Sequence, residues 1–182
     1  MLNIVMKHKF TYKLIGNVLP DILVELKKFV VKGPFFPSND FQSYTLTISP
    51  FHHPEPAMLD FFDRQMSKFF DLQGHIETNV AKMVPGGYVP EHSDYTANTY
   101  GKNQDNIIKF QIPIITNPGA GLMWRWDKGT GDRAEALYLE EGGIYMFNNC
   151  RVHSSVNLGR YDRYWLTSRW SADALLDKTL LD

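Results

Sequence analysis

The sequence lacks several features that would place it quickly in a class. Its 182 residues hold a single cysteine, Cys150, which excludes an internal disulfide framework. Basic residues number 19 and acidic residues 20, with no polybasic block, so no nucleic-acid partner is expected. The apolar run at residues 1–6 stops at Lys7 and is too short for a signal sequence or a membrane span. We therefore expect a cytoplasmic protein without a membrane partner.

Aromatic and other hydrophobic side chains are plentiful. Aromatic residues make up 14 % of the chain and the hydrophobic set 43 %, enough to fill one core and to exclude disorder as the main state. No repeat, low-complexity segment or linker divides the chain. We expect a single domain over residues 1–182, with a supporting part at 1–74, a core at 75–170 and a C-terminal tail at 171–182.

Two stretches in the first half of the chain have helical spacing. Pro20 suits a first helical turn and Gly33 suits the end of that helix. Between them, four apolar residues recur at helical intervals: Ile22, Leu26, Phe29 and Val30. A second helix is predicted from Pro56 to Gly74, with an apolar face made of Leu59, Phe62, Met66 and Phe69.

From about residue 75 the pattern changes to short apolar or alternating runs separated by Gly, Pro, Asn and Asp. Eight runs are predicted to be strands: His75–Val84, Val89–Tyr95, Asn106–Thr116, Gly121–Trp126, Ala134–Leu139, Gly143–Asn148, Arg151–Asn157 and Arg163–Trp170. A further strand is predicted at Phe41–Ile48. Strands without intervening helices favour a mainly β sandwich or barrel, and eight short strands are typical of a jelly roll, or double-stranded β-helix. The two helices would buttress one sheet from outside.

The first motif with chemical potential contains His92 and Asp94. On a strand, residues i and i+2 point to the same face, so the imidazole and the carboxylate can converge on one point. Together they would supply two ligands of the 2-His-1-carboxylate triad that holds non-haem Fe(II).

A second motif lies 61 residues later. His153 is a candidate for the third metal ligand, which would leave one face of the metal open. Arg163 follows ten residues after His153, past a turn that contains Gly159. An arginine at that place can reach the metal pocket and bind a dicarboxylate through its bidentate fork.

Five segments carry a resemblance to a known family: 89–94 (VPEHSD), 109–114 (KFQIPI), 141–149 (EGGIYMFNN), 153–157 (HSSVN) and Arg163. In these the chain resembles the Fe(II)/2-oxoglutarate-dependent oxygenases, specifically the aspartyl/asparaginyl β-hydroxylase-like branch, and is also similar to bacterial proline hydroxylases. The resemblance runs from about Lys82 to Trp170, roughly half of the chain.

The resemblance implies a set of roles. His92, Asp94 and His153 would bind Fe(II), and Arg163 would bind the distal carboxylate of 2-oxoglutarate. Lys109 and Gln111 share a face of their strand, and either could make a further contact with the cosubstrate; position 111 is often histidine in the β-hydroxylases. The implied reaction uses O₂ and 2-oxoglutarate to hydroxylate a C–H bond of an amino acid, free or in a peptide, and releases succinate and CO₂.

Several residues near these motifs are candidates for substrate contacts. Tyr88 and Tyr95 flank the first motif, and residues 95–104 are polar and rich in Gly and Asn, as in a loop or lid. Arg125 lies between two tryptophans that are expected to pack in the core, and it is a candidate partner for a substrate carboxylate.

Four other positions have ordinary structural explanations. Adjacent residues His52 and His53 would point apart, so a shared metal ion is not expected. His75, at the start of a strand, is predicted to be structural or exposed. Cys150 is predicted to be a small buried residue, because a nucleophilic cysteine needs a base and an orienting group. Asn157 is expected to serve a turn.

Two alternatives remain open. A cupin-type metalloenzyme that does not use 2-oxoglutarate would share the glycine-rich run before His92, although cupins usually have His-x-His where this chain has His92-Ser93-Asp94, and they do not need Arg163. A non-catalytic jelly-roll binding module would need neither the metal triad nor the arginine.

Overall fold

The computed structural model describes residues 12–33, 35–37, 43–48, 55–92, 107–125, 134–147 and 152–181. The strands are β1 (Tyr12–Asn17), β2 (Phe36–Pro37), β3 (Ser43–Ile48), β4 (His75–Met83), β5 (Tyr88–His92), β6 (Ile107–Ile115), β7 (Ala120–Arg125), β8 (Ala134–Leu137), β9 (Gly143–Phe147), β10 (His153–Asn157) and β11 (Arg163–Ser171). The helices are α1 (Pro20–Lys32) and α2 (Pro56–Asp60). Among the described helices, none has the length and apolarity to cross a membrane.

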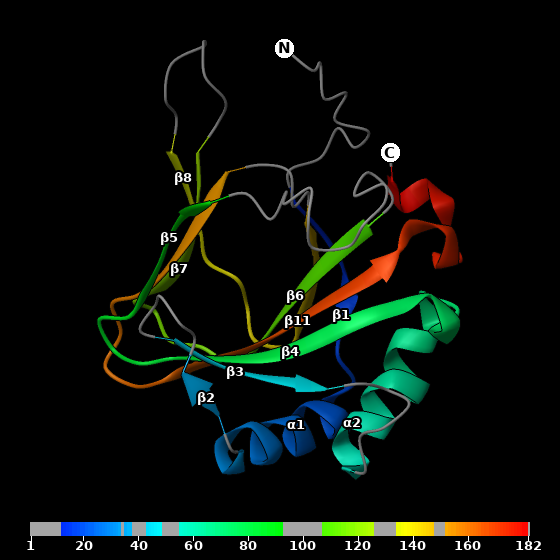
Figure 1. Ribbon diagram of the computed structural model, residues 1–182, viewed down its shortest axis with the longest axis horizontal. Helices are drawn as coiled ribbons and strands as arrows, with labels where there is room; N and C mark the ends of the chain where they lie inside the picture. The colour runs from blue at the N-terminus through cyan, green and yellow to red at the C-terminus, as the bar shows by residue number, and fades with distance from the viewer. Residues whose placement is uncertain are drawn as a thin grey trace.

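The strands form two antiparallel sheets. The major sheet has the order β1-β9-β6-β11-β4-β3-β2, and the minor sheet has the order β5-β10-β7-β8. The eight strands β4 to β11 alternate between the sheets except for β7 and β8, which pair within the minor sheet; this is the order of a jelly roll and confirms the predicted fold class. Each of the eight predicted runs contains or overlaps one of these strands. Figure 1 shows the two sheets meeting at the left, where β4 turns into β5 and β10 turns into β11.

Alternation along β11 separates the two faces of the major sheet. Tyr164, Leu166 and Trp170 lie in the main hydrophobic core with the helices, whereas Trp165 packs with Met83 and the minor-sheet residue Val89. Odd-numbered β11 residues therefore face the minor sheet, and even-numbered ones face the helices. Lys109 and Gln111 of β6 pair with the odd-numbered residues Arg169 and Thr167 and share their face.

The helices cover the outer face of the major sheet, as predicted (Figure 1). Helix α1 buries Ile22, Leu26 and Val30, and Pro20 occupies its first turn. Burying side chains of this size stabilises the folded protein by about 1.5–3 kcal/mol each. The helical spacing of these apolar residues therefore predicts the helix, because it places them together against the sheet.

The second predicted helix is wrong in its length and in part of its face. The α-helical part ends at Asp60, and a π turn, Phe61–Gln65, and a short 3₁₀ turn, Met66–Lys68, follow it. The π turn changes the phase of the repeat, so Phe61 and Phe62 are both buried while Leu59 is 39 % exposed.

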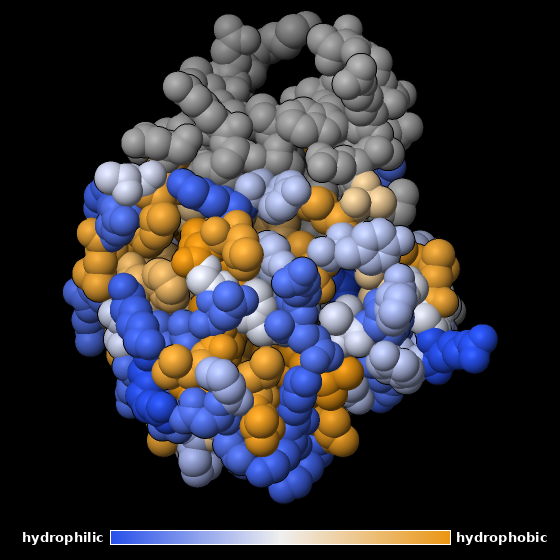
Figure 2. Space-filling model, turned by 180° about the vertical axis from the view of Figure 1, so that it is seen from behind, coloured by the Kyte–Doolittle hydropathy of each residue, from blue (hydrophilic) through white to orange (hydrophobic). Residues whose placement is uncertain are grey.

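The C-terminal segment is more than a tail. Its short 3₁₀ turns place Ala172 and Leu175 in the core, and Leu175 forms an isolated bridge with Phe70. At the surface, apolar and polar side chains are interspersed over the described residues at the back of the molecule (Figure 2).

The closed end of the sandwich is held by Asn157. Its side-chain nitrogen donates to the carbonyl oxygens of Met83 (2.9 Å) and Tyr161 (3.0 Å). Its side-chain oxygen accepts from Asn117 Nδ2 (3.1 Å) and the Gly159 amide (3.2 Å). The residue is fully buried, and these bonds use both halves of the amide. We call this set the Asn157 clamp, and it fits the turn role expected from the sequence.

A polar chain crosses the outer face of the major sheet beside His75. The indole N–H of Trp170 donates to Ser168 Oγ (2.7 Å), which lies 2.6 Å from Thr78 Oγ1, and Thr78 Oγ1 lies 2.9 Å from His75 Nε2. Because an indole only donates, the chain is fully satisfied when each hydroxyl donates toward His75 and Nε2 accepts. That arrangement requires a neutral imidazole.

We expect this chain to make folding sensitive to acid. Burial lowers the pKa of His75 from 6.5 to about 4, so between these values the unfolded chain binds a proton that the folded chain does not. The resulting stability is present above about pH 6.5 and is lost as the pH falls toward 4. For a half-buried ring we expect about 1–2 kcal/mol, or roughly 2–8 °C in Tm.

The measurement is thermal unfolding of the wild type and His75→Gln from pH 7.5 to pH 4. A glutamine oxygen can accept from Thr78 without titrating, so the difference in Tm between the two proteins should change with pH. The other histidines are common to both proteins and cancel. A constant difference across this range would contradict the role of His75.

Candidate metal and cosubstrate site

A β-bulge places His92 opposite His153. Strand β5 is an edge of the minor sheet, and its register with β10 shifts between the pairs His153↔His92 and Ser155↔Val89, so β5 has one extra residue there. Pro90 lies in the bulge, where a residue without an N–H is tolerated. Without the bulge, alternation would turn His92 away from the face on which Val89 packs.

The two histidines form a pair. Their ring centroids are 4.3 Å apart with an interplanar angle of 51°, and His153 is buried. His92 Nδ1 lies 2.8 Å from the carbonyl oxygen of Pro90. A carbonyl only accepts, so Nδ1 carries the proton and Nε2 keeps its lone pair, which is the tautomer a metal ligand needs.

The described residues alone do not complete a metal site. They contain no group of three His, Cys, Asp or Glu side chains placed to hold an ion. Asp94, the predicted carboxylate ligand, lies outside the described residues, two positions after the end of β5. The paired imidazoles supply two of the three donors of a 2-His-1-carboxylate Fe(II) site, and Asp94 follows His92 by two positions in the sequence.

Arg163 lies at the start of β11 and is directed toward the minor sheet. It is 2 % exposed, and its Nη1 donates to Ser155 Oγ (2.7 Å) and more weakly to the Gly121 carbonyl (3.4 Å). Its guanidinium lies 4.8 Å from the centre of the Trp165 ring. Within the described residues, Nε has no hydrogen-bond partner. Burial lowers the pKa of Arg163 to about 10, so the group stays cationic at neutral pH.

This arrangement suits an anionic ligand. A buried guanidinium without a carboxylate beside it is costly, and a bound carboxylate would restore both charge balance and the missing hydrogen bond. Ser155 lies two residues after His153 on the same face of β10, so the arginine and the histidine pair belong to one interior. Neither Ser155 nor Trp165 was singled out in the sequence, although the i+2 spacing from His153 to Ser155 was available.

Lys109 and Gln111 both lie on the inner face of the major sheet, as predicted, and both are buried. Gln111 pairs with Thr167 on one side and with Tyr145 on the other. Within the described residues, its Oε1 accepts no hydrogen bond.

The predicted substrate residues are less well supported. Tyr88 is 54 % exposed and alternates with the inward-facing Val89, so it lies on the outer face of the minor sheet, away from the histidine pair. Arg125 is the last residue of β7, next to the Trp124 that pairs with His153, but its side chain is outside the described part. Tyr95, Cys150, His52 and His53 are also outside it.

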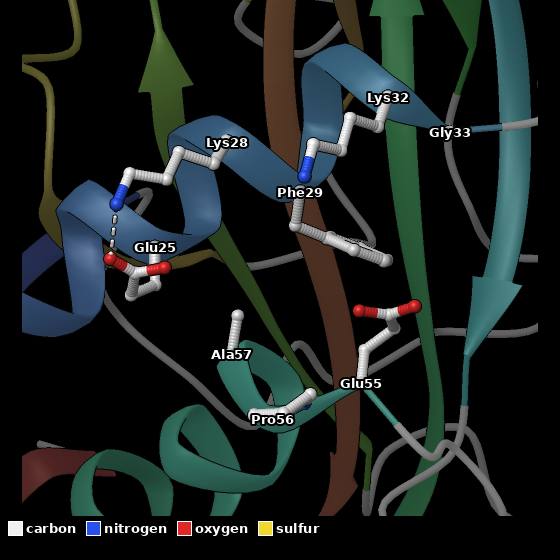
Figure 3. A pocket seen from close by; sticks show the side chains of 8 residues that line it. All are labelled: Glu25, Lys28, Phe29, Lys32, Gly33, Glu55, Pro56 and Ala57. Atoms are coloured by element: carbon white, nitrogen blue, oxygen red, sulfur yellow. Dashed lines mark hydrogen bonds and ion pairs between the residues drawn. The ribbon is translucent and has the colours of Figure 1, made fainter.

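A cavity of about 240 Å³ lies elsewhere, between α1 and α2 (Figure 3). Its lining residues are Glu25, Lys28, Phe29, Lys32, Gly33, Glu55, Pro56 and Ala57. The helices cover the outer face of the major sheet, so this cavity is separated by that sheet from the histidine pair and Arg163.

No protein-family model matches the chain, and no curated protein matches it either. Solved structures do. HygX from Streptomyces hygroscopicus, with nickel and 2-oxoglutarate bound, gives a TM-score of 0.64 at 10 % identity over 88 % of this chain and 82 % of HygX. A Pseudomonas putida prolyl-4-hydroxylase gives 0.64 at 17 % identity over 90 % and 93 % of the two chains.

A third similar structure is an oxidoreductase of the 2OG-Fe(II) oxygenase family from Burkholderia pseudomallei, with a TM-score of 0.65 at 11 % identity over 92 % of this chain and 87 % of that chain. At these identities the likeness establishes the fold. The chain has the jelly-roll fold found in 2-oxoglutarate oxygenases.

Proposed function

We propose that the protein is an Fe(II)- and 2-oxoglutarate-dependent dioxygenase that hydroxylates a C–H bond of an amino acid, free or in a peptide. The observation that carries this proposal is the combination, in one interior, of a histidine pair and a buried arginine whose Nε has no partner in the described part of the chain. A binding module needs neither, and a cupin without 2-oxoglutarate has no use for the arginine.

The residues present fit the implied groups. His92 and His153 would hold the metal with Asp94, and the Pro90 carbonyl fixes the tautomer of His92. Arg163 would bind the distal carboxylate of 2-oxoglutarate, oriented by Ser155, while Trp165 covers the guanidinium and keeps water from it. When bound, iron and 2-oxoglutarate would supply the oxidant that transfers one oxygen atom from O₂ to a C–H bond, with succinate and CO₂ as coproducts.

One of the similar structures supports an amino-acid substrate, because its name describes hydroxylation of an amino-acid residue. That structure is a prolyl-4-hydroxylase, whereas HygX is also known with hygromycin B bound, which shows a different small molecule in the same fold. We therefore place the substrate among small molecules and peptides, with amino acids first.

The test is succinate formation by the purified protein with Fe(II), O₂ and 2-oxoglutarate over a panel of amino acids and short peptides. Mass spectrometry of each candidate should reveal a product that has gained one oxygen atom in step with succinate. The control is the Asp94→Ala protein under the same conditions. A panel that yields neither coupled nor uncoupled succinate would refute the proposal.

A further inference from the structure

Gln111 presents an unmet hydrogen-bond acceptor to the interior that faces the minor sheet. The residue is 7 % exposed and sits in the middle of β6, between Thr167 and Tyr145 in the neighbouring strands. Within the described residues, its Oε1 has no donor. A buried acceptor without a partner destabilises the folded protein, so a ligand that brings a donor would remove an existing cost.

The cosubstrate cannot provide that donor. At neutral pH the two carboxylates and the keto group of 2-oxoglutarate only accept hydrogen bonds. They match Arg163, which only donates, and Lys109, which also only donates. The Nε2 of Gln111 could donate to 2-oxoglutarate, but its Oε1 would still have no donor.

We propose that Gln111 is a substrate-recognition residue, whose Oε1 accepts a hydrogen bond from the amino or imino N–H of an amino-acid substrate. This assignment rests on the proposed function and separates Gln111 from Lys109, which the sequence left as alternatives for the cosubstrate. It makes Lys109 the residue of the two that is suited to a carboxylate.

The charged side chains on the strands beside Gln111 are of both signs, as are the charges of an amino-acid substrate. Lys109 lies opposite Arg169 across β6 and β11, and Arg169 forms an ion pair with Glu77 across β11 and β4. The inner wall beside Gln111 therefore carries charges of both signs. An amino acid has both, and its nitrogen supplies the donor that Gln111 lacks.

The experiment uses three proteins: wild type, Gln111→Met and Gln111→Glu. Methionine has nearly the same shape and removes the amide, whereas glutamate keeps an acceptor in place. Calorimetry measures 2-oxoglutarate affinity in the presence of Ni(II), and thermal unfolding measures the ligand-free proteins. Thermal shifts with the Ni(II)- and 2-oxoglutarate-loaded proteins measure binding of each of the common L-amino acids. The N-methylated betaine of each amino acid that binds is the matched probe without an N–H.

We expect Gln111→Met to bind 2-oxoglutarate within about 3-fold of wild type and to gain a few degrees in Tm without ligands, because an unmet polar group has been removed. Amino acids that stabilise the wild type should bind Gln111→Met at least about 10-fold more weakly, and Gln111→Glu should recover that affinity. Their betaines should bind the wild type and Gln111→Met alike.

Three results would overturn the assignment. A loss of 10-fold or more in 2-oxoglutarate affinity in Gln111→Met would make Gln111 a cosubstrate residue. A lower Tm would give it a structural role. Amino acids that do not bind, or that bind wild type and Gln111→Met equally, would exclude recognition of their nitrogen. Failure of the wild type to bind 2-oxoglutarate would instead refute the proposed function, so the two failures are distinguishable.

Discussion

Replacing Arg163 with methionine is expected to weaken 2-oxoglutarate binding by about 10²–10⁴-fold. A guanidinium fork makes two charge-assisted hydrogen bonds to a carboxylate, each worth about 1.5–3 kcal/mol, and each 1.4 kcal/mol is a factor of ten in affinity. Arg163 is buried and keeps Nε unpaired among the described residues, so it meets the ligand without giving up a strong partner at that atom. Calorimetric titration with 2-oxoglutarate and Ni(II) measures the loss.

The same substitution should leave stability within a few degrees of wild type in the absence of ligand. It removes the bond to Ser155 and the contact with Trp165, but it also removes a desolvated charge that has no carboxylate beside it among the described residues. Arg163→Lys keeps the charge without the bidentate fork, so its affinity for 2-oxoglutarate should lie between those of the wild type and Arg163→Met. Arg160→Met, on the exposed turn between β10 and β11, is the control and should not change 2-oxoglutarate affinity. An unaltered affinity in Arg163→Met would remove this residue from the cosubstrate site.

Replacing His153 with alanine is expected to abolish measurable binding of Fe(II) or Ni(II). Loss of a group that only supports a ligand costs about 10–100-fold in metal affinity, and loss of a ligand from a three-ligand site costs more. His153 is buried against His92, at a ring separation of 4.3 Å, so no other described histidine is placed to replace it.

Metal content after loading and desalting is the measurement. The matched control is His75→Gln, which removes a histidine from the opposite face of the major sheet and should retain metal. Asp94→Asn tests the ligand that lies outside the described residues and should weaken metal binding less than His153→Ala, because an amide oxygen can still coordinate. Metal content equal to wild type in His153→Ala would refute the proposed ligand set.

The jelly roll was predictable because the hydrophobic pattern of each core strand can be recognised within the strand's own residues. In β11 the residues Tyr164, Leu166 and Trp170 face one core and Arg163 and Trp165 face the other interior, so both faces are buried and the run is almost continuous. Strand β1 was missed because it is an edge strand with a bulge near Gly16, and edge strands need little apolar alternation. The π turn at Phe61–Gln65 was missed because its effect on phase depends on tertiary packing.

The site was predictable where spacing alone brings groups together. The ten residues from His153 to Arg163 include the turn that joins β10 of the minor sheet to β11 of the major sheet, and both side chains face the interior between the sheets. The position of Tyr88 was not predictable, because the bulge at Pro90 decides which β5 residues face inward. The sequence also could not show that Gln111 Oε1 has no donor among the described residues, because the partners of a buried amide come from other strands.

The Asn157 clamp has a consequence for how this protein can diversify. Its fully buried side-chain amide ties Met83, at the end of β4, to the turn at residues 158–162, at the end of the sandwich where Arg163 lies. Gln111, Arg169 and Glu77 occupy positions farther along the same strands, away from that clamp. A change of Gln111, which we propose to contact the substrate, would therefore alter substrate choice without touching the hydrogen bonds of the clamp. A lineage with this arrangement can exchange one substrate for another in small steps, each compatible with survival of the fold.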